Sequence, residues 1–308
     1  MPTWLILTIL AYFLLAVANL GDKFLISKVL PSSKIYAFLI GLMSLVVFVA
    51  APWGLVWPGW SWLIFNLAVG ALFPWALLVM FTALKHGDTS RITILIGSAI
   101  PIFTFLLSLV LLGETYNFQQ TLGLILLIVG SLIIVFIKDQ PKSRKIISSI
   151  NKALWPSLLS AIIFAFYFIG TKYVYEHQPF LSSYIWLAGG NGLMALLFLV
   201  PASWRQEILS GLGYKSKKQQ TAKQKFLLII NQILGGLGSL IQHYAIFFGP
   251  VAIINALQGV QYVFLILGGW WLTLFFPKVI KENISRGVII QKVIAIIIIA
   301  VGLYFSTL

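Results

Sequence analysis

Long runs of apolar residues, separated by short polar or turn-forming segments, dominate the 308 positions of this chain. Ten of these runs approach the length of about 20 residues that an α-helix needs to cross the hydrocarbon core of a bilayer. Polar residues do not alternate with the apolar ones, so the runs predict membrane-spanning helices rather than strands. We expect spans at residues 4–26, 35–52, 61–84, 92–112, 119–137, 153–175, 182–201, 226–248, 251–275 and 288–306.

The composition points to the same class of protein. Hydrophobic residues make up 60% of the chain and charged residues only 9%, whereas a soluble domain averages about 25% charged residues. Such a chain needs lipid as its solvent, and we predict an all-α membrane protein whose partners include the bilayer. There is no cysteine, which excludes disulfides and thiolate metal sites.

The 21 basic residues are distributed unevenly between the two sides of the predicted bundle. All but Lys172 lie in or beside the odd connections, those that follow spans one, three, five, seven and nine. Because positive charge accumulates on the cytoplasmic side, we expect these connections in the cytoplasm and both termini outside the inner membrane. The net charge of +14 thus suits anionic headgroups, and no nucleic-acid partner is expected.

The two halves of the chain share a pattern of polar and small residues. Asn66 and Gly70 in span three have the same separation as Asn231 and Gly235 in span eight. Further matches occur in the same order along the chain, at the start of spans two and seven and at the end of spans one and six. They predict a repeat of five spans.

An odd number of spans per repeat makes the second copy enter the membrane from the opposite side. We therefore predict ten transmembrane helices as two inverted five-helix repeats, at residues 1–137 and 153–308, joined by a basic linker at 138–152. In transporters built this way, the solute site lies near the bilayer midplane where the repeats meet.

One stretch of the first half resembles the EamA-type, ten-span branch of the drug/metabolite transporter superfamily. The pattern is a proline inside span four, a Leu-Gly-Glu at its end and spaced glycines in span five. Here these residues are Pro101, Leu112, Gly113, Glu114, Gly123 and Gly130. In the second half, Phe276-Pro277-Lys278 stands where the Leu-Gly-Glu is expected, so the motif is confined to residues 90–130.

The resemblance implies a transporter of amino acids, other metabolites or drugs, often coupled to protons. It also implies cytoplasmic termini, in conflict with the charge distribution, and on orientation we follow the charges.

Span nine holds the densest set of polar residues. Asn255, Gln258 and Gln261 recur at intervals of three, which places them along one face of a continuous helix. Their amides offer both donors and acceptors to a polar solute. The alternative is that they bond neighbouring helices and hold the bundle together.

Other polar residues within spans are further candidates for solute contact or ion coupling. Gln242 and His243 lie in span eight, and the imidazole of His243 could accept a proton near neutral pH. Asn19 and Asp22 share a face of span one, where Asp22 is a second candidate for coupling. The alternatives are a neutral His243 bonded to a neighbouring carbonyl and an Asp22 that lies at the membrane interface. Cavity walls are expected from Trp75, Tyr12, Tyr167 and Asn191.

No motif for nucleotide binding, metal hydrolysis or an esterase nucleophile occurs, so we expect no enzyme, cofactor or metal. We predict a secondary transporter that moves a small polar solute, amino acid-like or related, by alternating access, with proton coupling open. The alternatives are a membrane enzyme acting on lipid-linked substrates and a non-transporting scaffold. For the oligomeric state, the sequence is compatible with both a monomer and a homodimer.

Overall fold

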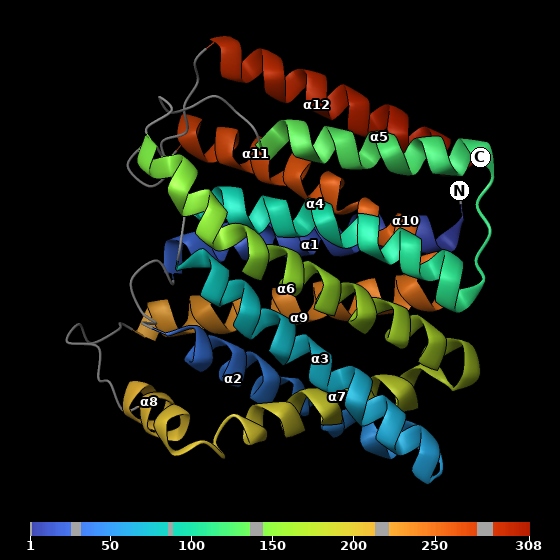
Figure 1. The fold of residues 1–308 in the computed structure, drawn as a ribbon, viewed down its shortest axis with the longest axis vertical. Helices are drawn as coiled ribbons and strands as arrows, with labels where there is room; N and C mark the ends of the chain where they lie inside the picture. The colour runs from blue at the N-terminus through green and yellow to red at the C-terminus, as the bar shows by residue number, and fades with distance from the viewer. Residues whose placement is uncertain (1, 26–31, 86–88, 136–143, 213–221, 276–285) are drawn as a thin grey trace. The chain divides into compact units, whose positions relative to one another are not determined.

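The structure is a computed structural model that describes residues 2–25, 32–85, 89–135, 144–212, 222–275 and 286–308. These parts of the chain are built from α-helices with short 3₁₀ and π segments (Figure 1). In chain order, the elements are α1 (Thr3–Leu25), α2 (Ser33–Met43), η1 (Ser44–Trp53), α3 (Trp60–Leu84), α4 (Thr89–Leu107), η2 (Ser108–Leu112), α5 (Phe118–Val135), α6 (Arg144–His177), α7 (Phe180–Leu197), α8 (Ala202–Leu212), α9 (Ala222–Phe248), α10 (Val251–Ala256), α11 (Gln258–Phe275) and α12 (Arg286–Phe305).

Seven segments of the described chain are long and apolar enough to cross a membrane, and two shorter apolar helices, in α5 and α12, accompany them. The all-α membrane class predicted from the apolar runs is therefore confirmed. Helix boundaries lie within a few residues of the predicted spans. Span three, for example, was expected at 61–84 and is the helix Trp60–Leu84.

Four segments differ in detail from the expected pattern. Span two changes from α-helix to 3₁₀-helix at Ser44, and span four ends in the π turn Ser108–Leu112. Residues 144–152, expected in the basic linker, are the first turns of the long helix α6, and the rest of that linker lies outside the described residues. Span nine is interrupted, as described below.

The helices form two compact units, each drawn from both halves of the sequence. Unit 1 comprises Met1–Val29, Glu114–Ser143 and Lys218–Leu308, and unit 2 comprises Leu30–Gly113 and Arg144–Lys217. The predicted boundaries of the sequence repeats, at residues 137 and 153, therefore do not separate the units. The repeat itself stays a prediction.

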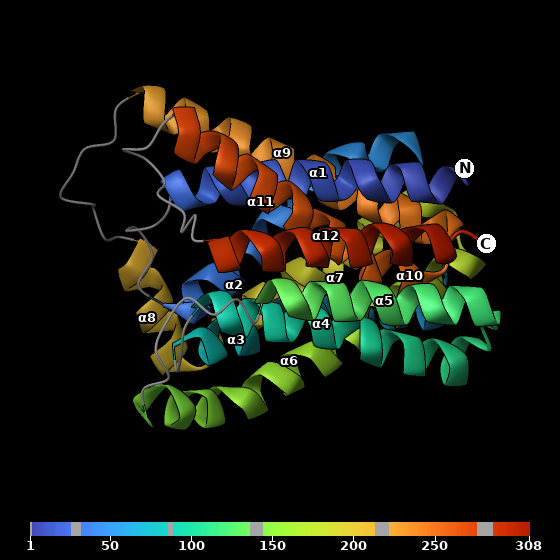
Figure 2. The same ribbon diagram turned by 90° about the horizontal axis from the view of Figure 1, so that it is seen from above.

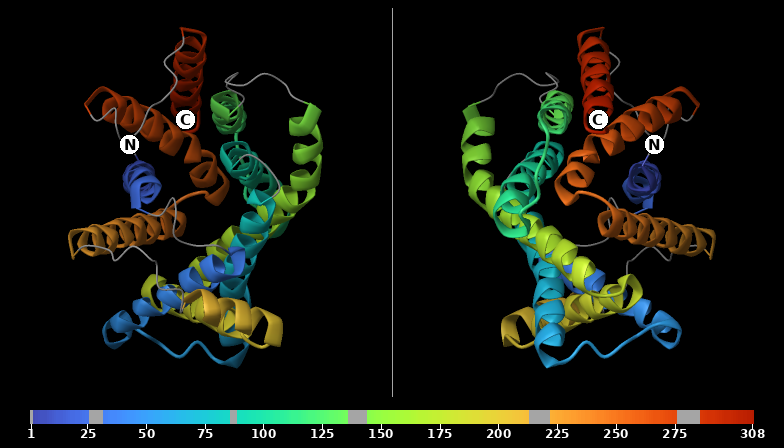
Figure 3. Two further views of the ribbon diagram at one scale, coloured as in Figure 1. Left: turned by 90° about the vertical axis from the view of Figure 1, so that its left-hand side faces the viewer. Right: turned by 90° about the vertical axis from the view of Figure 1, so that its right-hand side faces the viewer.

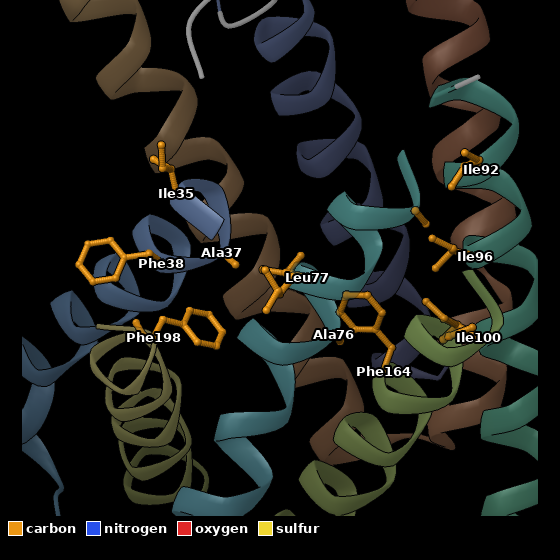
Figure 4. Packing of buried hydrophobic residues seen from close by; sticks show 14 of the residues in the cluster. Ile35, Ala37, Phe38, Ala76, Leu77, Ile92, Ile96, Ile100, Phe164 and Phe198 are labelled. Carbon is orange, nitrogen blue, oxygen red and sulfur yellow. The ribbon is translucent and has the colours of Figure 1, made fainter. Parts of the chain in front are cut away.

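In unit 2, α3 packs against α6 and α7, α4 packs against α6, and α2 packs against α3 and α7. The core of this unit is shown in Figure 4, where Phe38 on α2, Leu77 on α3 and Phe164 on α6 lie among the buried residues. Close approach of α3 to α7 depends on glycine, because a Cβ on Gly70 would lie 2.9 Å from the Cα of Gly190. Small residues at such contacts are typical of helix pairs in membranes.

In unit 1, α1 packs lengthwise against α9 and also contacts α11, as Figure 2 shows. The α5 helix lies alongside α12 (Figure 1). The start of α1 and the end of α12 lie at the same end of this unit in both side views (Figures 1 and 2). The contact of Trp4 with Gly249 and the hydrogen bond from the Asn117 side chain to the Leu308 carbonyl place two even connections at that end as well.

The short helix α8 is fixed to the start of α2 within unit 2 (Figure 3). The ammonium of Lys34 lies 2.6 Å from the carboxylate of Glu207 and 5.0 Å from the centre of the Trp204 ring. The Ser32 hydroxyl also donates to Glu207. The Lys34 ammonium and this hydroxyl hold the pKa of Glu207 below its ordinary value.

Candidate functional site

Span nine consists of two helices. The first, α10, begins after Pro250 and ends at Ala256, and the second, α11, begins at Gln258. At the turn between them, the Val260 amide donates to the Leu257 carbonyl at 2.8 Å, a tighter closure than the i to i−4 pattern of an α-helix. Sequence analysis treated 251–275 as one helix, and this interruption was missed.

The interruption places the three amides of span nine on two segments. Asn255 lies on α10 and is buried, whereas Gln258 and Gln261 lie on α11, where Gln261 is buried and Gln258 half-buried. They therefore do not follow one continuous helix face. Gly259, just after the break, packs close to α5, because a Cβ there would lie 2.6 Å from the Ser131 hydroxyl.

A tyrosine on α1 is bonded at this interruption. The Tyr12 hydroxyl donates to the Ile254 carbonyl at 2.9 Å, and it accepts from the amide nitrogen of Gln242 on α9 at 3.2 Å. In an uninterrupted helix, the Ile254 carbonyl would accept the amide of Gln258. Tyr12 thus joins α1, α9 and α10, and its hydroxyl satisfies the Ile254 carbonyl that the break leaves without a helical partner. Polar side chains often satisfy such freed backbone groups inside membranes.

A second tyrosine, beside these bonds, has a hydroxyl with no hydrogen-bond partner in the part of the chain that the structure describes. Tyr262 lies on α11, one turn after Gln258, and is 8% exposed, and its hydroxyl oxygen is buried with no partner. Its ring lies near enough to Tyr12 for the two hydroxyls to interact electrostatically. A buried polar atom left unpaired costs about 1–3 kcal/mol, so this hydroxyl is suited to bonding a group that enters from outside the chain.

Two of the predicted polar residues lie elsewhere in unit 1. His243 follows Gln242 on α9 and is buried; neighbours on a helix point about 100° apart, so it does not share the direction of Gln242. Asn19 is exposed on α1. The side chain of Asp22 lies outside the described residues.

Two of the predicted aromatic walls belong to unit 2. Tyr167 on α6 is buried, with its ring 5.1 Å from that of Phe73. Trp75 on α3 is 39% exposed and lies 6.1 Å from the ring of Phe198. The predicted site residues are therefore divided between the units, and in unit 1 the Tyr12 hydroxyl links Gln242 to the first helix of span nine.

Two further buried polar side chains, one in each unit, bear on the site. In unit 2, the side-chain oxygen of Asn191, a residue expected to line a cavity, is buried without a partner among the described residues. In unit 1, Lys292 was counted among the basic residues beside the connection that follows span nine. Its side chain on α12 is buried, and its ammonium lies 5.6 Å from the ring centre of Trp270 on α11.

Lys172 is the one basic residue of the sequence predicted to lie near the even connections. It is also buried, and its ammonium lies 3.4 Å from the carboxylate of Glu176. Among the described residues, no group of three or more His, Cys, Asp or Glu side chains is placed to hold a metal ion.

Comparison with known proteins agrees with this architecture. Residues 2–136 match the model of the EamA-like transporter family. The first five predicted spans are therefore similar to this family. The resemblance found in span four and span five is thereby confirmed, and over residues 2–136 this EamA-like protein is similar to a family of membrane transporters.

The fold also occurs among solved structures, of which 22 chains match. One of them, described only as "Crystal structure of protein", has a TM-score of 0.70 and 16% sequence identity, and the match covers 100% of this chain and 99% of that one. At this identity, the likeness shows a shared fold over the full length and nothing of the solute. No curated protein matches the chain.

Proposed function

We propose that this EamA-like protein is a secondary transporter that moves a small polar metabolite, amino acid-like or related, across the inner membrane by alternating access. The observation that carries the proposal is the interrupted span nine, where the Tyr12 hydroxyl bonds both a backbone carbonyl at the break and the Gln242 amide. Broken helices inside a membrane are a recurrent basis for solute sites in secondary transporters.

Ten spans are supported by where the chain ends lie in unit 1. An even number of crossings returns the chain to the side where it started, and α1 begins at the end of unit 1 where α12 finishes. The contacts of Trp4 with Gly249 and of Asn117 with Leu308 join this end to the connections that follow spans eight and four. Those two connections carry no basic residues, as the predicted topology requires.

Helix pairing supports the inverted repeat. In unit 1, span one packs on spans eight and nine (α1 on α9 and α11); in unit 2, span six packs on spans three and four (α6 on α3 and α4). In the predicted repeat, span one corresponds to span six, span three to span eight and span four to span nine. Exchanging corresponding spans converts the contacts of one unit into those of the other. Gly21 on α1 and Gly170 on α6 occupy matching places, and they contact Asn231 and Val69 on the matching partner helices.

The proposed solute contacts are grouped at the break in span nine. They are Asn255, Gln258 and Gln261 of that span and Gln242 of α9, with the orphaned hydroxyl of Tyr262 as an additional donor. These side chains carry donors and acceptors but no formal charge, so they suit a solute that is polar and compact.

An amino acid-like solute is favoured because its carboxylate suits the start of α11. Peptide dipoles leave positive partial charge at a helix N-terminus, and the Tyr262 hydroxyl lies one turn further along the same helix. Side chains on helices lean toward the N-terminus, which directs this hydroxyl toward the break. An anionic group bound there would satisfy the buried hydroxyl.

Residues away from the break are proposed for supporting roles. His243 and Asp22 are candidates for proton coupling, and Asn19, Tyr167 and Trp75 remain proposed solute contacts. In unit 2, the orphaned oxygen of Asn191 is a better-supported contact than Trp75, whose ring packs on Phe198.

Uptake by purified protein in liposomes tests the proposal. Replacing Gln258 and Gln261 together with Leu should abolish flux of radiolabelled amino acids without unfolding the protein. Gln291→Leu is the matched control, because Gln291 bonds the Ile133 carbonyl between α12 and α5 and lies outside the network at the break. Unchanged flux in the double variant would contradict the proposed site.

A further inference from the structure

An open apolar groove runs over one face of unit 2, between α3, α6 and the π turn that ends span four. Its volume is about 540 Å³. The residues that define this α3–α6 groove include Phe65, Ala68, Leu111, Phe166, Gly170 and Tyr173. Tyr173 is the only one of its described lining residues with a polar side-chain group.

Local structure keeps the groove open. The π turn Ser108–Leu112 widens the end of span four, and Gly113 follows it with the left-handed φ of 65°. On the floor, Gly170 lets α6 approach α3, because a Cβ there would lie 2.7 Å from a methyl of Val69. The floor is thus fixed by backbone packing, whereas Leu111 and Phe166 form exposed walls.

The length of the groove matches one leaflet of a bilayer. Along α6 the lining extends from Ile163 to Tyr173, which is about 15 Å at the helical rise per residue. The hydrocarbon core is about 30 Å thick, so the groove covers about half of it. Both α3 and α6 are long and apolar enough to cross the membrane, which puts the groove at the depth of the acyl chains.

Aromatic rings form the end of the groove nearest the membrane surface. The ring of Tyr173 stacks on Trp62 at 5.9 Å and lies 4.4 Å from the imidazole of His177. His177 is the last residue of α6, and Trp62 lies in the first turn of α3. Tryptophan and tyrosine favour the level of the headgroups, where an apolar ring and a polar tip are both accommodated.

We propose that the α3–α6 groove binds one phospholipid of the leaflet on the side of the even connections. An acyl chain lies along the groove, and the ester and headgroup region meets Trp62, Tyr173 and His177. A polar solute does not fit this surface, since it would exchange water for an apolar wall without hydrogen bonds. The site is separate from the polar network of unit 1 and does not depend on the solute proposed there.

Lipid retention tests the site. Ala68→Phe fills the groove from an exposed position, and Ile64→Phe, one turn earlier on α3 and outside the lining, is the matched control. The proteins are equilibrated with palmitoyl-oleoyl-phosphatidylethanolamine and palmitate, purified in mild detergent and weighed by native mass spectrometry. The wild type and Ile64→Phe should retain one more phospholipid than Ala68→Phe. Equal phospholipid retention by all three, or retention of palmitate alone, would overturn the proposal.

Photo-crosslinking gives a second measurement that needs no variant. A phosphatidylethanolamine with a diazirine in mid-chain should attach mainly within residues 65–72 and 163–173. Labelling spread evenly over exposed apolar helix faces, including that of α12, would show an ordinary lipid shell and overturn the specific site.

Discussion

At the scale of single residues, the buried polar atoms of unit 1 are of two kinds. Tyr12 is bonded twice, to the Ile254 carbonyl and to Gln242, whereas the Tyr262 hydroxyl has no partner. Both are tyrosines in the interior of the same unit. The first stabilises the protein, and the second is available to a solute, so removing each hydroxyl should have different effects.

Tyr262→Phe removes a hydroxyl that bonds none of the described residues. Melting temperature should stay unchanged or rise, because a buried unpaired group costs about 1–3 kcal/mol. Solute affinity should fall about tenfold, the equivalent of 1.4 kcal/mol for one hydrogen bond. Thermal unfolding and solute titration on the same sample check both. Lower stability with unchanged affinity would contradict the role given to Tyr262.

Tyr12→Phe should have the opposite stability effect. It leaves the Ile254 carbonyl without its side-chain donor, and hydrogen bonds between membrane helices are worth about 0.6 kcal/mol on average and up to about 1.7. A lower unfolding temperature than that of the Tyr262→Phe protein is expected, measured in the same detergent. Equal melting temperatures would show that the bond across the break contributes nothing.

At the scale of elements, hydropathy was sufficient to place the spans, because twenty apolar residues have one stable arrangement in lipid. The break in span nine was not predicted. No proline lies within it, and the amides at three-residue spacing matched a continuous helix. Gly259 beside the polar Gln258 was the available signal. The orphaned hydroxyl of Tyr262 could not be found from sequence, because it depends on which helices meet.

Two glycine positions test how closely the helices pack. Gly70→Ala should destabilise unit 2 by about 1–3 kcal/mol, since its new methyl would meet the Leu187 carbonyl and Gly190. Gly236→Ala is the control, because nothing lies within 4 Å of a Cβ there and alanine favours a helix by about 1 kcal/mol. Thermal unfolding should move in opposite directions. A shift of the same sign in both would contradict the close α3–α7 contact.

The attachment of α8 to α2 should depend on pH. Because its folded-state pKa is lowered, Glu207 contributes stability above its unfolded pKa of about 4.3, and this is lost as pH falls through the folded value. Both charges are partly exposed, so Glu207→Gln should cost no more than about 1 kcal/mol at pH 7. Melting curves from pH 7 to pH 3 should converge for the two proteins. A difference that persists at pH 3 would exclude the ion pair as its cause.

At the scale of the whole molecule, the uneven charge determines the predicted orientation. Twenty of the 21 basic residues lie on the side of the odd connections, which should place Leu308 outside the cytoplasm. A C-terminal alkaline phosphatase fusion should therefore be active and a green fluorescent protein fusion dark. The reverse pattern would show that the termini are cytoplasmic, as the family resemblance implied.

The central claim is that the polar network at the break in span nine carries a small solute across the membrane. Counterflow tests it most directly, because it requires no knowledge of the coupling ion. Liposomes containing the protein are loaded with unlabelled amino acids, one at a time, and the entry of the labelled form is followed. The account predicts saturable counterflow of at least one amino acid by the wild type and none by the Gln258→Leu, Gln261→Leu protein. Equal entry into both sets of liposomes would contradict it.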